Sequence, residues 1–400
     1  MDRQKNKISH MEAAHGGYAP QIFEIGPLGR WLPGTRALAR SKGFDWRAAA
    51  LVALLAWLPL PLLALISDGG YGRVTASMLS DWGVHFRLLL SVPALLFADA
   101  FCGARLSAIA AHFHIPEIVG EENRPALEAL LARTKRACES AWVAAVIVIA
   151  AYIITVVLFT RLPLAEFPLW QRGSAVRATT PSGWWHVIVS APLLLALVMG
   201  WLWRWLVWFW LLIRLARMPF ELCAAHPDHA AGLKFVGFSV RAFVPIGFAV
   251  GAMLAGRVAA EVMRTGAKLE TFQYVLAEVV IAVIAMAVIP TVAFSLRLMA
   301  EWRAGVFTYG RLSSGLGQRF EEKWIRAGRK LGPDMLEQTD FSAAIDLSSY
   351  VANVYDMQLL PIDIRSIVIL AIFTAAPMLP VVLVGAPLSV ILDDLAGVFF

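Results

Sequence analysis

Seven segments of this chain are long and apolar enough to cross a lipid bilayer, and this limits its fold more than any other feature. Five contain no Asp, Glu, Lys or Arg over about 18 or more residues, the length that spans a hydrocarbon core about 30 Å thick. They are residues 48–67, 141–160, 184–203, 279–296 and 366–392. Two more segments are interrupted by charges: 88–113 contains Asp99 and Arg105, and 236–259 contains Arg241 and Arg257.

The composition excludes a water-soluble globular protein. Hydrophobic residues make up 59% of the chain and charged residues 16%, which leaves too little charged surface to cover a core in water. The apolar runs are continuous, whereas the strands of a transmembrane barrel alternate over about 10 residues. The predicted fold is therefore an all-α integral membrane protein, a bundle of about seven transmembrane helices with a small cytoplasmic helical hairpin.

The distribution of Lys and Arg predicts the orientation. With a cytoplasmic N-terminus, the cytoplasmic segments hold 26 of the 35 Lys and Arg residues and the external segments hold 8. The predicted parts are a cytoplasmic tail (1–47), a six-helix region (48–296), a cytoplasmic hairpin (297–365) and a last transmembrane helix with a short tail (366–400). Topology accounts for the net charge of +6, so we expect anionic lipid headgroups at the cytoplasmic face and no nucleic acid as partners.

The hairpin is the largest predicted soluble part. We expect a charged helix to continue from the sixth span to about Gly328, a turn at Gly332 and Pro333, and a second helix from about Asp340. Because this region is small for an independent domain, we expect it to pack on the inner face of the bundle. Residues 123–137 are amphipathic and are expected to form a helix at the inner membrane interface.

Charges inside spans are the usual pointers to function, since each costs roughly 2.5–3.5 kcal/mol in hydrocarbon unless it has a partner. Asp99 and Arg204 differ in depth by about 7 Å of helical rise, an offset that an arginine side chain can span. Asp99, near the middle of its segment, is the residue most expected to serve a permeation or proton-linked role. Glu278 and Arg257 lie at similar depth on adjacent spans, where a structural ion pair is favoured.

Arg204 also has a purely structural interpretation. The segment from Trp184 to Ile213 would be about 45 Å long as a straight helix, so Arg204 would lie near the inner interface. Trp201 and Trp208 would then cover its guanidinium group by cation–π contact. They belong to a group that resembles an interfacial aromatic belt: Trp201, Trp203, Trp205, Trp208 and Trp210.

Four histidines, a thiol and a carboxylate are predicted to meet at the inner face. They are His112, His114, Cys223, His226, Asp228 and His229. Imidazole, thiolate and carboxylate are suitable zinc ligands, but the spacing matches no recognised zinc pattern. The favoured interpretation is structural, with Asp228 capping the fifth helix. No hydrolase, metalloprotease or phosphate-loop motif is present, and the sequence predicts no cofactor.

Several motifs in the C-terminal half resemble those of a group of uncharacterised bacterial integral membrane proteins. They are His226-Pro227-Asp228 followed by Ala231-Gly232-Leu233, the segment from Asp340 to Leu347, Leu360-Pro361, and Ala376-Pro377 with Pro380. The group usually has Gly-Gly-Leu after His-Pro-Asp, so Ala231 is a departure. The resemblance implies a bacterial inner-membrane protein and no activity.

Three functions remain open. Small-molecule or ion transport is favoured by a narrow margin, from the seven spans, Asp99 and prolines inside spans that can break helices around a substrate. The alternative is a non-enzymatic scaffold or signalling component of an envelope complex, which the hairpin favours and which implies an envelope-protein partner or a homo-oligomer. A membrane enzyme rests only on the histidines.

Overall fold

The structure is a computed structural model that describes residues 22–23, 46–115, 118–161, 163, 167–172, 179–326 and 339–385. Throughout these ranges every regular element is a helix. Seven of the described helical segments are long and apolar enough to cross a membrane, so the all-α multi-pass prediction is confirmed. They are Trp46–Asp68, Trp82–His112, Glu121–Arg161, Pro181–Ala216, Lys234–Thr265, Leu269–Arg326 and Ile364–Leu383.

Most of these spans contain several helices in series. Span 1 has α3 (Trp46–Trp57) and α4 (Pro59–Asp68); span 2 has α6 (Trp82–His85), η2 (Phe86–Ser91) and α7 (Val92–His112); span 3 has η3 (Glu121–Asn123), α8 (Arg124–Cys138) and α9 (Ala141–Arg161); span 4 has α11 (Pro181–Trp185), η5 (His186–Ser190) and α12 (Ala191–Ala216). Span 5 has η6 (Lys234–Phe238), α13 (Ser239–Ala242) and α14 (Val244–Thr265); span 6 has η7 (Leu269–Phe272), α15 (Gln273–Val288), η8 (Ile289–Phe294), α16 (Ser295–Phe320) and η9 (Glu321–Arg326); span 7 has α18 (Ile364–Ala375), η11 (Ala376–Met378) and α19 (Leu379–Gly385). The short helices α5 (Arg73–Leu79) and α10 (Leu169–Arg172) lie between spans, and α17 (Thr339–Tyr355) pairs with α16.

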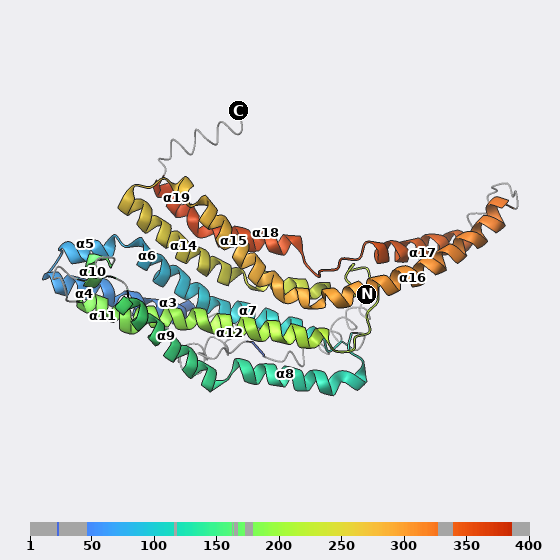
Figure 1. Ribbon diagram of the computed structural model, residues 1–400, viewed down its shortest axis with the longest axis horizontal. Helices are drawn as coiled ribbons and strands as arrows, with labels where there is room; N and C mark the ends of the chain where they lie inside the picture. The colour runs from blue at the N-terminus through green and yellow to red at the C-terminus, as the bar shows by residue number, and fades with distance from the viewer. Residues whose placement is uncertain are drawn as a thin grey trace, which may run out of the picture.

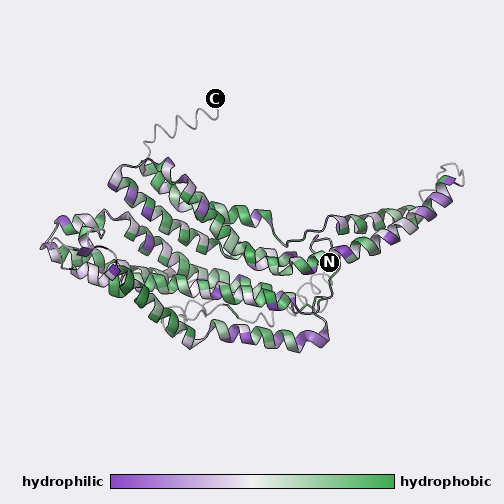
Figure 2. Cartoon of the chain, viewed as in Figure 1, coloured by the Kyte–Doolittle hydropathy of each residue, from purple (hydrophilic) through white to green (hydrophobic). Residues whose placement is uncertain are grey.

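The spans run side by side along the long axis of the molecule (Figure 1). We call the end with His112, Ala216 and Ile364 the arm end, because the α16–α17 pair leaves the bundle there. The opposite end, with α4, α5, α10 and α11, is called the far end. Apolar residues dominate the bundle, whereas α8 and the outer part of the arm are more polar (Figure 2).

The region predicted to form a hairpin contains two paired helices, α16 and α17. The second helix begins at Thr339, close to the predicted Asp340, and the predicted turn at Gly332 and Pro333 lies outside the described residues. Only the base of the arm packs on the bundle, where Asn353 Nδ2 donates to the Ala225 carbonyl at 3.2 Å. The rest projects away (Figure 1), because α17 buries a single apolar side chain, Val354.

Helix α8, predicted to lie at the inner membrane interface, packs against protein along one face. It lies alongside the arm-end half of α12, roughly parallel to the bundle axis (Figure 1). Its buried stripe of Leu127, Leu131, Thr134 and Cys138 recurs at helical spacing and faces protein. An amphipathic helix is able to bury its apolar face against another helix or against lipid. The sequence pattern alone did not distinguish these two positions for α8.

Candidate functional site

The structure brings Asp99 of α7 and Arg204 of α12 together. Nη1 of Arg204 donates to Oδ1 of Asp99 at 2.7 Å, and their side chains are 4% and 14% exposed for Arg204 and Asp99 respectively. The Trp201 ring covers the guanidinium group, with 4.3 Å from Cζ to the ring centroid. Trp201 is itself fixed by a hydrogen bond from Nε1 to the Leu95 carbonyl at 3.0 Å. The charge of Arg204 is therefore neutralised and shielded by groups held on two spans.

Two further tryptophans of α12 donate to backbone carbonyls that lack a normal helical donor. Trp205 Nε1 bonds the Met286 carbonyl at 2.6 Å, and that carbonyl is free because Pro290, four residues on, has no N–H. Trp203 Nε1 bonds the Ala137 carbonyl at 3.1 Å, at the C-terminal end of α8. Tryptophans predicted to form an aromatic belt thus join α12 to α8 and α15. Their N–H groups satisfy backbone carbonyls, which lipid tails are unable to do.

An aromatic side chain also bonds a carbonyl freed by a proline at the far end. Pro192 cannot donate to the Ile188 carbonyl, and the Tyr152 hydroxyl of α9 donates to it at 2.9 Å. Prolines inside spans 4 and 6 therefore mark places where an aromatic side chain from another span completes the backbone bonding.

The Asp99–Arg204 pair lies at a level where several spans begin. Cys102, one turn beyond Asp99, donates from Sγ to the Ala242 carbonyl at 2.7 Å, which places the start of α14 beside it. At the same end Arg241 pairs with Asp363 at 3.1 Å, directly before α18. The Trp203 bond places the α8–α9 junction at this level as well. From here α9, α14 and span 7 run 21, 22 and 20 residues toward the far end, about 30 Å each.

Arg257 and Glu278 form no ion pair with each other, and both side chains are exposed on the described surface. The two residues lie at different depths, counted from the level of the Asp99–Arg204 pair. Glu278 is eight residues from Met286, which bonds Trp205 at that level, whereas Arg257 is 13 residues from the start of α14. At 1.5 Å per residue the offset is about 8 Å.

The histidine cluster is not assembled as a metal site. Among the described residues, no group of three or more His, Cys, Asp and Glu side chains is placed to hold a metal ion. The His112 ring packs on Phe235, with 4.3 Å between ring centroids, and His114 Nδ1 lies 3.3 Å from the Ala111 carbonyl. Cys223 is exposed, and the Nδ1 atom of His229 is buried without a hydrogen-bond partner.

Asp228 organises the loop before span 5. Its carboxylate accepts backbone N–H bonds from Ala230, Gly232 and Lys234 at 2.8, 3.0 and 3.1 Å. The N-cap position of η6 is Leu233, so Asp228 bonds the first helical residue, Lys234, from outside the cap position. Partial burial raises the pKa of Asp228, but these three donors and the His226 ring outweigh burial and hold the pKa below its usual range.

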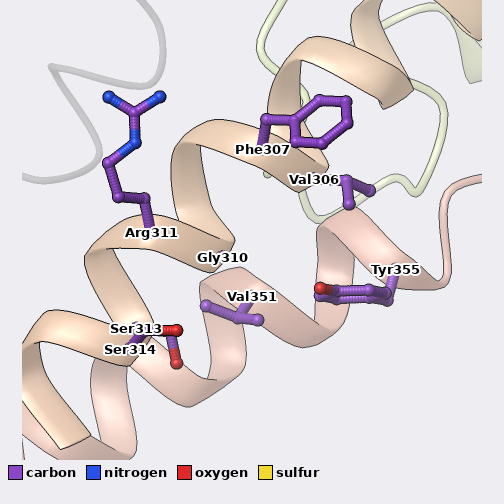
Figure 3. Close-up of a pocket in the computed structure, with 8 residues that line it drawn as sticks. All are labelled: Val306, Phe307, Gly310, Arg311, Ser313, Ser314, Val351 and Tyr355. Atoms are coloured by element: carbon purple, nitrogen blue, oxygen red, sulfur yellow. The ribbon is translucent and has the colours of Figure 1, made fainter. Parts of the chain in front are cut away.

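The arm carries an open groove of about 590 Å³ between α16 and α17. Figure 3 shows Val306 and Phe307 of α16 and Val351 and Tyr355 of α17 around the groove. Its floor is formed by small residues, Gly310, Ser313 and Ser314, and Arg311 extends from its rim. Phe307 is 73% exposed, so the groove presents apolar surface to its surroundings.

Comparison of the chain with protein-family models, with curated proteins and with solved structures finds no match. The function must therefore be argued from the site itself.

Proposed function

We propose that this protein is a non-enzymatic scaffold of a bacterial inner membrane, whose arm binds a helix of another envelope protein. The observation that carries the proposal is the groove on a helical pair that projects from the bundle. Small residues along its floor allow a close helix approach, and the apolar rim provides the contact area. Arg311 favours an acidic residue on the bound helix.

The level of the Asp99–Arg204 pair in the bundle favours a role in anchoring two helices over a role in permeation. Because α9, α14 and span 7 each extend about 30 Å from its level, the pair lies at the arm-side boundary of the hydrocarbon core. His112 and Ala216 lie 13 and 12 residues beyond Asp99 and Arg204, so α7 and α12 rise out of the membrane on that side. The pair then fixes two helices where they leave the bilayer.

The positive-inside bias supports a cytoplasmic arm end, with the N-terminus on the same side. Basic residues cluster at this boundary, among them Lys135, Arg136 and Arg241, and they favour anionic headgroups of the inner leaflet.

The test compares two exposed apolar residues of α16. Phe307 lines the groove, whereas Leu312 is 57% exposed and does not line it. Proteins carrying Phe307→Asp or Leu312→Asp are extracted from their own membrane beside the wild type. We expect Phe307→Asp to lose a stoichiometric partner that wild type and Leu312→Asp retain. Equal retention by both variants contradicts the proposal.

Small-molecule or ion transport is the second candidate, favoured by the π-helical segments η2 and η5 inside spans 2 and 4. It predicts that Asp99→Asn abolishes a solute flux in reconstituted vesicles while the protein stays folded.

A further inference from the structure

A second cluster of polar side chains lies at the far end, where the two π-helical segments of spans 2 and 4 occur. η2 contains Arg87 and η5 contains His186. Each segment ends in a serine that bonds a carbonyl of another span: Ser91 Oγ to Ala249 at 2.9 Å and Ser190 Oγ to Ala56 at 2.7 Å. These bonds hold the widened turns in place, and widened turns of this kind are frequent at binding sites.

Arg87 forms no ion pair in the described structure, and Asp81 is the acid closest to it in the fold. Its one hydrogen bond runs from Nε to the Gly83 carbonyl of its own helix at 2.8 Å. The nearby acid, Asp81, is already bonded by Trp170 Nε1 at 2.9 Å and by the Val84 N–H at 3.2 Å. The Nη atoms of Arg87 donate no hydrogen bond in the described structure, so they keep donors available for a ligand.

Arg257 lies close enough to this guanidinium group for the two charges to interact. A point at the absent Cβ of Gly83 is 3.1 Å from Asp81 Oδ1, 3.5 Å from Arg87 Nη2 and 3.6 Å from the carbonyl of Gly256, the residue before Arg257. Arg257 is exposed and forms no ion pair, so a second cation flanks the site. Two guanidinium groups on spans 2 and 5, with one occupied acid between them, leave an excess of positive charge.

Span 4 adds donors without partners. The Nδ1 atom of His186 and the Nε1 atom of Trp185 are both buried and form no hydrogen bond. The His186 ring is held edge-on against Trp170, at 5.4 Å between centroids. Buried polar atoms of this kind are normally satisfied, and His186 lies close enough to Arg87 for their charges to interact. The atoms without partners point to a missing hydrogen-bonding group.

We propose that Arg87 and Arg257, with His186, bind a phosphate group at the far end of the bundle. A tetrahedral anion offers several oxygens and can bridge two guanidinium groups on different helices, as arginine does best in bidentate form. The phosphate belongs either to a phospholipid headgroup, which enters sideways past the exposed Arg257, or to a free anion.

The experiment measures thermal unfolding and native mass of the full chain with three added probes: phosphatidylglycerol, phosphatidylcholine and inorganic phosphate. The variants are Arg87→Gln and Arg257→Gln, and the control is Arg264→Gln, an exposed α14 residue paired with Glu261 at 2.8 Å. We expect the first two to weaken binding at least about tenfold and the control to bind as wild type does. Arg257 is exposed, so its variant tests binding even if Arg87→Gln does not fold.

The probes separate the two sources. A phospholipid adduct that depends on Arg87 and Arg257, with no response to inorganic phosphate, identifies a headgroup. A response to inorganic phosphate alone identifies a free anion. Binding of every probe by Arg257→Gln at wild-type strength, or no binding by the wild type, overturns the proposal.

Discussion

Arg204 and Arg87 both lie inside candidate spans, yet their guanidinium groups have different surroundings. Arg204 donates to Asp99 on another span at 2.7 Å and is covered by Trp201, whereas Arg87 bonds only a carbonyl of its own helix. A buried charge with a dedicated partner contributes to packing, and a charge without one has a free bonding capacity. The comparison teaches that Arg204 has an acidic partner at contact distance on another span and that Arg87 has none, which is why a ligand is proposed only at the far end.

The largest effect is expected where the complete pair is broken. Asp99→Ala leaves Arg204 buried without its carboxylate, which costs about 3–5 kcal/mol, whereas Arg204→Met together with Asp99→Ala removes both charges and restores most of the stability. Thermal unfolding in detergent measures both variants. If the single and double variants unfold at the same temperature, the pair does not stabilise the bundle.

The next effect concerns the carbonyl freed by Pro290. Trp205→Phe keeps the ring and removes the donor to Met286, at a cost of about 1–3 kcal/mol. In a Pro290→Ala background the new backbone N–H supplies that donor, so the same substitution costs much less. Trp210→Phe, which changes a partly exposed tryptophan of the same helix, is the control. An equal cost of Trp205→Phe in both backgrounds contradicts the role assigned to Trp205.

The pH dependence of stability tests the loop at the arm end. Asp228 has a folded-state pKa below its ordinary value of 3.8, so its contribution is complete above about pH 4 and is lost as the pH falls through the folded-state pKa. Unfolding of wild type and Asp228→Asn is compared from pH 7 down to pH 2. We expect wild type to be more stable at pH 7 and the difference to shrink in acid. A difference that does not change with pH refutes the assignment.

The smallest effect is expected at Ala231, where the backbone angle φ is +53°. This left-handed conformation costs a residue with a side chain about 1–2 kcal/mol, and glycine avoids that cost. Removal of the buried methyl group loses about 0.8 kcal/mol of stability in turn. Ala231→Gly should therefore stabilise the protein by about 0.5 kcal/mol. Ala230→Gly, at a buried neighbour with ordinary φ, should destabilise it.

The sequence predicted the spans well because about 20 apolar residues in a row have few alternatives in lipid. It also indicated that Arg204 is able to reach Asp99, since depth can be counted along helices. It failed for Arg257 and Glu278 because their depths depend on where α14 and α15 meet their neighbours. The roles of Trp203 and Trp205 were missed, although Pro290 marks a freed carbonyl four residues earlier. Which side chain fills such a gap depends on tertiary packing.

The central claim is that the arm binds another protein while the bundle anchors it. Native mass spectrometry of the protein, gently extracted from its own membrane, tests this most directly, because it reads subunits and bound small molecules together. The account predicts a second protein in fixed ratio, lost in Phe307→Asp and kept in Leu312→Asp. A lone protomer that carries a solute in the bundle, and no partner under any extraction condition, would contradict it.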